Sequence, residues 1–148
     1  MGKKIVITGG IGYIGTELCK IYSGYSWNDK ITVIDNKFSS ERVNQLRKWN
    51  MNFVHGDIRD IETINDICKN ADVIHHLAGI TDVPRVKSES NKSQDKLIKE
   101  VAEVGTKNIL DAMSNDCKII MPSTHVIYEG LEKVSKNIEE NEPAKPIL

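Results

Sequence analysis

Short apolar segments alternate with amphipathic segments along most of this chain of 148 residues. The apolar segments are rich in isoleucine and valine, which is typical of strands buried on both faces of a sheet. In the segments between them, apolar residues recur every three or four positions, which predicts helices that pack on such a sheet. The expected strands are residues 3–8, 30–35, 51–55, 71–77 and 118–121. The expected helices are residues 13–22, 41–49 with Ser39 or Ser40 as N-cap, a stretch through Ile61, Ile64, Ile67 and Cys68, and a long helix with Leu97, Ile98, Val101, Val104, Gly105, Ile109 and Met113 on one side.

A cluster of glycines follows the first predicted strand and leads directly into the first predicted helix. Gly9 and Gly10 are expected to adopt positive φ in the turn, and Gly12 lacks the Cβ that would collide with a bound phosphate. Gly15 is expected to let the helix lie close to the strand. Backbone N–H groups and the positive end of the helix then point at one place, where a pyrophosphate is stabilised.

The second predicted strand ends in Asp35, twenty residues after Gly15. A carboxylate in this position accepts hydrogen bonds from the hydroxyls of an adenosine ribose. Strands that alternate with helices predict a parallel sheet, with ligands at the carboxyl ends of its strands. The predicted fold class is therefore α/β, a Rossmann-type doubly wound parallel sheet with helices on both faces.

Composition and charge exclude several other classes. The formal net charge of −1 gives no electrostatic reason to expect nucleic acid as a partner. Cys19, Cys68 and Cys117 are far apart and form no CxxC pair, which indicates buried reduced thiols and no metal site. No apolar run approaches the roughly 20 residues of a membrane span, and the opening residues lead into a strand and not into a signal peptide. A cytoplasmic location is expected.

Six motifs, in order and spacing, resemble the extended short-chain dehydrogenase/reductases, and among them the NAD-dependent epimerase/dehydratases that act on nucleotide sugars. The motifs are Thr8-Gly9-Gly10-x-Gly12-Tyr13-Ile14-Gly15, Asp35, Gly56-Asp57-Ile58-Arg59-Asp60, His76-Leu77-Ala78-Gly79, Gly105-Thr106-x-Asn108-Ile109-Leu110 and Ser123-Thr124-x-x-x-Tyr128. The resemblance covers nearly the whole chain. It implies that residues 1–128 form an NAD-binding Rossmann domain and that residues 129–148 form an irregular segment beyond it.

The resemblance also implies roles for individual residues. Asp35 would hold the adenosine ribose, Asp57 and Ile58 would contact the edge of the adenine, and Thr124 would supply the active-site hydroxyl that bonds the reacting oxygen of the substrate. The other cofactor-binding residues implied are Gly9, Gly12, Tyr13, Ile14, Gly15, Asn36, Leu77, Ala78 and Gly79, with Tyr13 expected to pack beneath the cofactor loop. NAD and a nucleotide sugar are the implied ligands, and a homodimer is compatible with the family.

Two departures from the family pattern concern catalysis. Ala102 stands where the family usually carries an asparagine, three residues before the glycine of the Gly-Thr motif. None of the four tyrosines is followed by lysine at the fourth position, so the Tyr-x-x-x-Lys pair that supplies the general base is absent. Glu142-Pro143-x-x-Pro146 resembles the stretch that precedes this pair in the family. We therefore expect that the sheet is incomplete at the C-terminus, that the chain stops before its base and substrate domain, and that it is inactive alone.

Three alternatives compete with a partial oxidoreductase. A non-catalytic dinucleotide-binding or regulatory module would be naturally this short, and a split enzyme would receive its base and substrate domain from another polypeptide. A methyltransferase that uses S-adenosylmethionine shares the glycine loop but does not explain His76-Leu77-Ala78-Gly79. A phosphate-binding role for Arg85 or Lys87 is a further hypothesis, because this loop borders the substrate cleft in the family.

The pair His75-His76 lies at the end of the fourth predicted strand and could suggest a metal site. Adjacent residues of a strand point to opposite faces of the sheet, so the two rings cannot bind one ion together. No metal is therefore expected in this chain.

Overall fold

A computed structural model describes residues 2–25, 28–80, 92–131 and 138–146, and Arg85 and Lys87 lie outside these residues. Five parallel strands form one sheet in the order β3-β2-β1-β4-β5. The strands are β1 (Lys4–Thr8), β2 (Lys30–Asp35), β3 (Asn52–His55), β4 (Val73–His76) and β5 (Lys118–Ile120). All five coincide with predicted strands, so the α/β class and the parallel sheet are confirmed.

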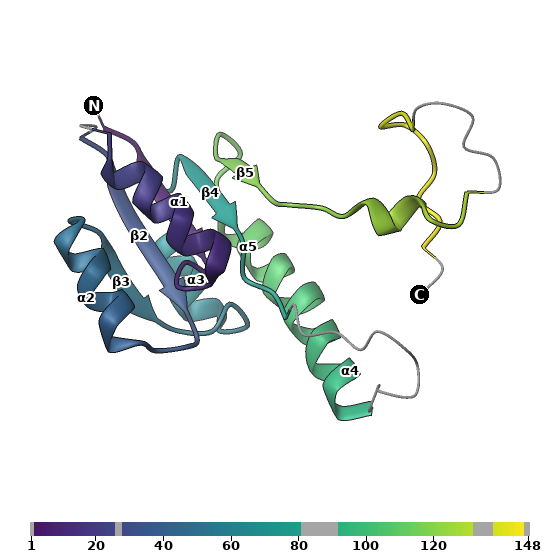
Figure 1. Cartoon of the computed structure of the whole chain (residues 1–148), viewed down its shortest axis with the longest axis horizontal. Helices are drawn as coiled ribbons and strands as arrows, with labels where there is room; N and C mark the ends of the chain where they lie inside the picture. The colour runs from purple at the N-terminus through teal and green to yellow at the C-terminus, as the bar shows by residue number, and fades with distance from the viewer. Residues whose placement is uncertain (1, 26–27, 81–91, 132–137, 147–148) are drawn as a thin grey trace.

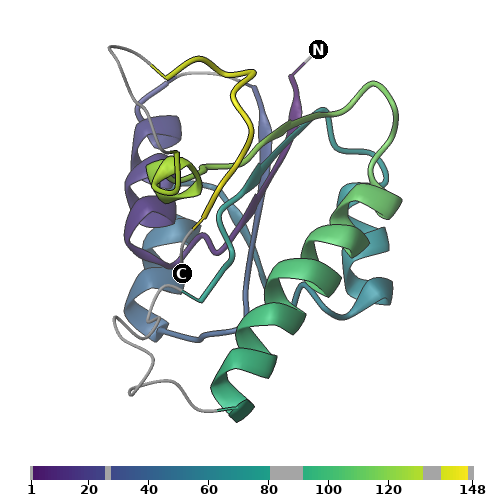
Figure 2. The same ribbon diagram turned by 90° about the vertical axis from the view of Figure 1, so that its right-hand side faces the viewer.

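Helices cover both faces of the sheet (Figures 1 and 2). They are α1 (Tyr13–Ser23), α2 (Ser40–Lys48), α3 (Ile61–Cys68), α4 (Lys92–Glu100) and α5 (Thr106–Ala112), with a π-helical segment, η2 (Val101–Gly105), between the last two and a 3-10 turn, η3 (His125–Tyr128), after β5. In Figure 2, α1 and α2 lie on one side of the sheet and α3, α4 and α5 lie on the other. The arrangement is the doubly wound one that the alternation of strands and helices predicts.

Successive strand residues supply two separate cores. In β1, Ile5 and Ile7 pack in the core beneath α1 and α2, whereas Val6 packs in the core beneath α3 and α5. This division follows from the period of two in a strand, which sends neighbouring side chains to opposite faces. Because both faces are covered, adjacent residues of a central strand can both be apolar, as in Ile5-Val6-Ile7 of β1.

Side-chain caps fix where α2 and α3 begin. Ser39 is the N-cap of α2, where its Oγ accepts from the backbone N–H of Arg42. Asp60 is the N-cap of α3 and accepts from the backbone N–H groups of Glu62 and Thr63. Each cap satisfies N–H groups that have no partner inside the helix. The prediction that Ser39 or Ser40 caps the second helix is therefore confirmed for Ser39.

The long predicted helix is interrupted by the π-helical segment Val101–Gly105. Gly105 is buried there, and a Cβ on it would lie 2.3 Å from Cδ1 of Ile58. The close approach of the helix to the loop after β3 therefore requires glycine at this position. The segment forms although Ala102 replaces the asparagine usual in the family.

β5 lies at one edge of the sheet, and the chain runs away from the sheet after it (Figure 1). Backbone hydrogen bonds join Gly130 N–H to the carbonyl of Lys145 and Lys145 N–H to the carbonyl of Ile127. The described residues after Tyr128 contain neither helix nor strand. A domain boundary at residue 128 stays a prediction.

Across the described residues, no helix combines the length and apolar character needed to cross a bilayer.

Candidate functional site

The turn after β1 is built on Gly9, which has a φ of +68°. Its N–H donates to the carbonyl of Ile34 at 2.8 Å, and a Cβ on it would lie 2.7 Å from the backbone N of Ala78. Both the positive φ and the close approach of the β4 end exclude a side chain. The expected role of Gly9 in the turn is confirmed.

Gly10 does not adopt positive φ, so this part of the prediction is wrong. A different constraint applies, because a Cβ on Gly10 would lie 2.2 Å from Cγ1 of Val33 on β2. A Cβ on Gly15 would lie 2.4 Å from the carbonyl oxygen of Gly9, which explains how α1 approaches the turn so closely. By contrast, a Cβ on Gly12 would meet only that same oxygen, at 3.1 Å.

The amino end of α1 presents donors to solvent. Gly12 is the N-cap, and no side chain caps the helix. The first helical residues Tyr13 and Ile14 are 85% and 61% exposed, so the prediction that Tyr13 packs beneath the cofactor loop is wrong. The first N–H groups of a helix lack intrahelical acceptors and carry the positive end of its dipole. This end of α1 is therefore suited to bind an anionic group beside Gly12.

Asp35 lies at the carboxyl end of β2 and contacts the glycine turn directly. Its Oδ2 accepts from the N–H of Ile11 at 3.2 Å, and its Oδ1 accepts from the N–H of Lys37 at 2.9 Å. A carboxylate offers about four acceptor positions, so two backbone bonds leave capacity for a further pair of hydroxyl donors. The geometry is compatible with the predicted ribose contact.

Asp57, at the end of β3, is paired with Arg59. The guanidinium donates Nε to Oδ1 at 3.0 Å and Nη2 to Oδ2 at 2.8 Å, and Nη1 lies 3.4 Å from Oε2 of Glu100. The hydrogen bonds from Arg59 lower the pKa of Asp57 to about 2. Asn36 donates to the same carboxylate at 3.5 Å. The predicted residues Asn36 and Asp57 are therefore brought together, in a network whose arginine the sequence analysis left without a role.

The Ile58 side chain is only 5% exposed and packs in the core against Gly105. A side-chain contact with adenine is therefore excluded in this structure, and only the Ile58 backbone remains for it. Asn108 Nδ2 donates to the carbonyls of Ile58 and Arg59 at 3.1 and 3.0 Å. The asparagine thus fixes the loop after β3 from the side of α5.

The turn after β4 is fixed by the Thr8 hydroxyl. Its Oγ1 accepts from the N–H groups of Leu77 at 3.2 Å and Ala78 at 3.1 Å. No atom of the described residues lies within 4 Å of where a Gly79 Cβ would be, so this position is open. Leu77 and Ala78 are partly buried, and this turn contacts Gly9 across the sheet edge. The ends of β1 and β4 therefore lie together, and Gly9 also bonds to Ile34 near the end of β2. The sequence predicted cofactor binding by residues at these three strand ends.

His75 and His76 occupy opposite faces of the sheet, as predicted. His75 Nε2 lies 2.8 Å from the hydroxyl of Tyr22 on α1. His76 Nδ1 lies 2.9 Å from Thr8 Oγ1, and its Nε2 lies 2.9 Å from Thr106 Oγ1 on α5. The described residues hold no group of three or more side chains suited to a metal ion.

The hydrogen bonds of Thr8 determine the tautomer of His76. Because Thr8 Oγ1 already accepts from two backbone N–H groups, its proton is donated to Nδ1 of His76. The ring is then neutral, with its proton on Nε2 and directed at Thr106. A second ring proton would oppose the Thr8 hydroxyl that holds the turn after β4.

We expect the free energy of unfolding to fall as pH decreases below about 6.5. Burial lowers the pKa of His76, and also of His75, so the unfolded chain binds protons that the folded chain resists. Each histidine contributes up to about 1.4 kcal/mol per pH unit in this window. Urea unfolding between pH 8 and pH 5 measures the slope. His76→Gln should reduce it, the exposed control His55→Gln should not, and a flat wild-type profile would contradict the prediction.

Thr124 lies four residues after β5 and is exposed. Its Oγ1 accepts from the N–H of Val126 at 3.4 Å and so caps η3. The segment that carries it is drawn away from the sheet in Figure 1. The hydrogen bond given for Thr124 is the one to Val126, and its catalytic role stays a prediction.

The three cysteines are buried and unpaired, as expected. Burial raises the pKa of Cys19 and of Cys68 to about 12, which makes both thiols poor nucleophiles near neutral pH.

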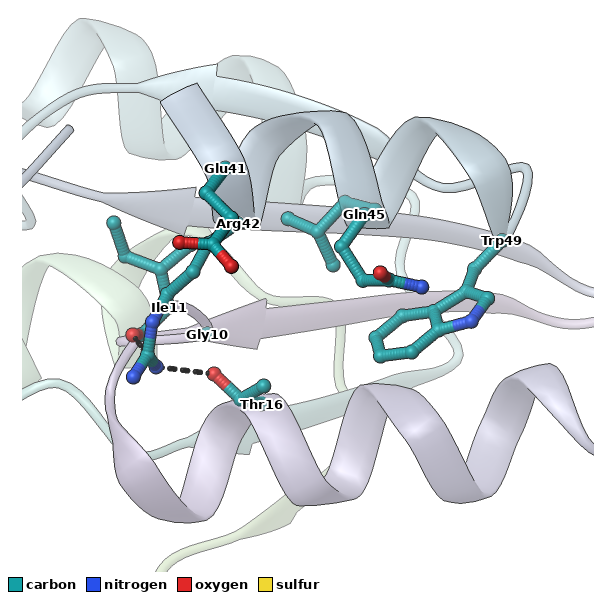
Figure 3. A pocket seen from close by; sticks show the side chains of 8 residues that line it. Gly10, Ile11, Thr16, Glu41, Arg42, Gln45 and Trp49 are labelled. Carbon is teal, nitrogen blue, oxygen red and sulfur yellow. Dashed lines mark hydrogen bonds between the residues drawn. The ribbon is translucent and has the colours of Figure 1, made fainter. Parts of the chain in front are cut away.

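A pocket of about 280 Å³ lies between α1 and α2, behind the glycine turn (Figure 3). Gly10, Ile11, Thr16, Glu41, Arg42, Gln45, Leu46 and Trp49 line it. Asp35, Asp57 and Ala78, which lie at or just after the ends of β2, β3 and β4, are not among the residues that line this pocket. Sequence analysis missed Arg42, which spans the pocket, because its position in α2 carries no motif.

Comparisons with known proteins agree with this architecture. The sequence model of the 3-beta hydroxysteroid dehydrogenase/isomerase family matches residues 6–146. CDP-paratose 2-epimerase of Salmonella typhi is 32% identical over 146 residues, which are 93% of this chain and 41% of the epimerase. The chain therefore spans about two fifths of the length of this relative.

Two solved structures show the same fold. The UDP-Glc/GlcNAc 4-epimerase of Campylobacter jejuni superposes with a TM-score of 0.78 and 25% identity, over 99% of this chain and 44% of that one. The dTDP-glucose 4,6-dehydratase of Bacillus anthracis, solved in complex with NAD, gives a TM-score of 0.73 at 23% identity, over 98% and 44% of the two chains. The Rossmann-type fold expected from the sequence is thereby confirmed.

Proposed function

Since the chain belongs to the 3-beta hydroxysteroid dehydrogenase/isomerase family, we propose that it is the NAD-binding portion of an epimerase/dehydratase-type oxidoreductase that acts on a nucleotide sugar. The relatives support the reaction class and the substrate class, because the Salmonella typhi protein is a CDP-paratose 2-epimerase and the Campylobacter jejuni protein is a UDP-Glc/GlcNAc 4-epimerase. The resemblance to NAD-dependent epimerase/dehydratases is confirmed at the level of the family.

One observation carries the proposal: the uncapped amino end of α1 lies beside a turn that Asp35 contacts through Ile11. A dinucleotide has a central diphosphate flanked by a ribose diol, and the turn and the carboxylate suit these two parts. The missing Cβ of Gly12, which would meet only the Gly9 oxygen at 3.1 Å, leaves room for the close approach of a phosphate. The residues present therefore fit NAD, the ligand of the Bacillus anthracis dehydratase.

The residues of this chain would bind and orient the cofactor. Bound NAD would supply a hydride acceptor and donor for a carbon of the substrate. Tyr13 and Ile14 N–H groups would hold the diphosphate, Asp35 would hold the ribose, and the turn Leu77-Ala78-Gly79 would border the cofactor. The Thr124 hydroxyl would donate a hydrogen bond to the reacting oxygen of the sugar and lower the cost of charge on it.

We expect NAD to bind more tightly than NADP, by roughly tenfold to a hundredfold. The Asp35 carboxylate accepts from a 2′-hydroxyl but repels a 2′-phosphate. Calorimetric titration of the isolated chain with both dinucleotides measures the ratio. Asp35→Asn should bring the two affinities together, whereas Asp66→Asn, an exposed control on α3, should leave the ratio unchanged.

Equal affinities for NAD and NADP in the wild-type chain would remove Asp35 from the ribose site. A wild-type chain that binds neither dinucleotide would overturn the proposed function itself.

A second candidate is a dinucleotide-binding module whose catalytic groups come from another polypeptide or that has no catalytic role. It is compatible with these 148 residues, in which no tyrosine is followed by lysine at the fourth position. Affinity purification of the chain from its native cells, followed by mass spectrometry, tests it. Recovery of a second chain that carries Tyr-x-x-x-Lys would support the split enzyme.

A further inference from the structure

Arg42 joins α2 to the glycine turn. Its Nη1 lies 2.5 Å from the carbonyl oxygen of Ile11, 2.6 Å from Thr16 Oγ1 and 3.3 Å from the carbonyl oxygen of Gly12. Figure 3 shows the side chain reaching from α2 to the turn, with the bond to Thr16 dashed. A single guanidinium therefore holds the two carbonyls that directly precede α1.

Ile11 is held on one side by the last residue of β2 and on the other by a residue of α2. Asp35 accepts from its N–H at 3.2 Å, and Arg42 donates to its carbonyl. The side chain of Ile11 is buried among the residues beneath α1 and α2, which removes a further degree of freedom. The orientation of the glycine turn is therefore determined by groups on β2 and α2 as well as by its own glycines.

The contact between Arg42 and the Gly12 oxygen also bears on the Tyr13 N–H, because both belong to the same peptide group. The Gly12 oxygen accepts from Thr16 N at 2.9 Å, from Thr16 Oγ1 at 2.7 Å and from Arg42. Because the peptide group is planar and trans, the Tyr13 N–H points opposite to the Gly12 oxygen that Thr16 and Arg42 hold. A cation at the oxygen end also polarises the group and strengthens that N–H as a donor.

We propose that Arg42 is a positioning residue for the diphosphate of the dinucleotide. It acts through the Gly12–Tyr13 peptide group and touches no part of the cofactor. The inference rests on the proposed function and adds to it a residue outside the glycine motif and outside the strand ends. The inference assigns the two parts of the ligand to different residues. Arg42 affects the binding of the diphosphate, whereas Asp35 and the loop after β3 bind the adenosine.

The test compares ligands that contain a diphosphate with one that lacks it. Wild type, Arg42→Met and the matched control Arg47→Met, an exposed arginine of the same helix, are titrated with NAD and ADP by calorimetry. Adenosine binding is followed at high concentration by NMR. Arg42→Met should weaken NAD and ADP roughly tenfold to a hundredfold and leave adenosine unchanged, and Arg47→Met should change none of the three.

Thermal unfolding of each variant accompanies the titrations. Equal weakening of ADP and adenosine by Arg42→Met would show a merely structural clamp between α1 and α2 and would overturn the inference, as would unchanged affinity for ADP. If Arg42→Met does not fold, Thr16→Val decides, because it removes the hydroxyl that links Arg42 to Gly12. A selective loss of ADP and NAD affinity in this variant supports the inference, and its absence overturns it.

The wild-type titration separates the two hypotheses. A wild-type chain that binds neither NAD nor ADP contradicts the proposed function, whereas one that binds both with no effect of Arg42→Met contradicts only the role of Arg42.

Discussion

Gly12→Val is expected to raise the dissociation constant for NAD at least about a hundredfold while the fold is retained. Gly12 has φ −69° and ψ 178°, a conformation that any residue adopts, and a Cβ there meets only the Gly9 carbonyl. The valine side chain is therefore expected to weaken NAD binding and to leave the turn intact. The methyl groups of valine would occupy the place where the first N–H groups of α1 converge. Calorimetry with NAD and far-ultraviolet circular dichroism measure the two effects separately.

Two further glycine variants serve as controls for this prediction. Gly10→Val should destabilise the fold itself, because its Cβ would lie 2.2 Å from Val33 Cγ1. Gly24→Ala, at the exposed carboxyl end of α1, should change neither folding nor binding. Normal NAD binding by a folded Gly12→Val variant would show that the glycine is a structural residue of the turn alone.

The chain by itself is expected to turn over no nucleotide sugar. A general acid or base contributes about 10²–10⁴ to the rate, and no Tyr-x-x-x-Lys pair is present to supply it. The Thr124 hydroxyl can orient an oxygen but cannot itself take its proton. Epimerase, dehydratase and reductase assays with CDP-, dTDP- and UDP-sugars, on a preparation verified by mass spectrometry, test this expectation.

A longer chain that carries the Tyr-x-x-x-Lys pair and a substrate domain should be active. In that chain Thr124→Val should lower kcat far more than it weakens NAD binding, because the hydroxyl contacts the reacting oxygen and not the dinucleotide. Turnover by residues 1–148 alone would require a base among the residues present. It would overturn the proposal that these residues form only the NAD-binding portion of the enzyme.

Local patterns predicted most of the fold because the sheet is buried on both faces. Strand positions follow from apolar segments, and the opposite directions of His75 and His76 follow from the strand period alone. The Gly9 turn and Asp35 follow from a motif with a physical basis in backbone geometry. These features depend on residues close in sequence, so the sequence is sufficient to locate them.

The features that the sequence did not reveal are contacts between residues distant in sequence. Gly10 was assigned a positive φ, whereas the structure requires glycine there because Val33 lies beneath it on the neighbouring strand. The sequence did not indicate that the Ile58 side chain packs against Gly105, 47 positions later in the numbering, which leaves the Ile58 backbone for the predicted adenine contact. Arg42 was overlooked for the same reason, since its partners are on another helix. Such contacts appear only once the chain is folded.

The edge strand β5 has consequences for self-association. An unpaired strand edge can recruit the edge of another molecule, and Ile120 and Met121 are 41% and 58% exposed here. The strand is only three residues long, begins with the charged Lys118 and is followed within two residues by Pro122, which cannot donate a backbone hydrogen bond. Short length, a lysine and a proline are the devices that discourage edge-to-edge aggregation. In the part of the chain that the structure describes, β5 therefore exposes apolar side chains while giving a second sheet little backbone on which to extend.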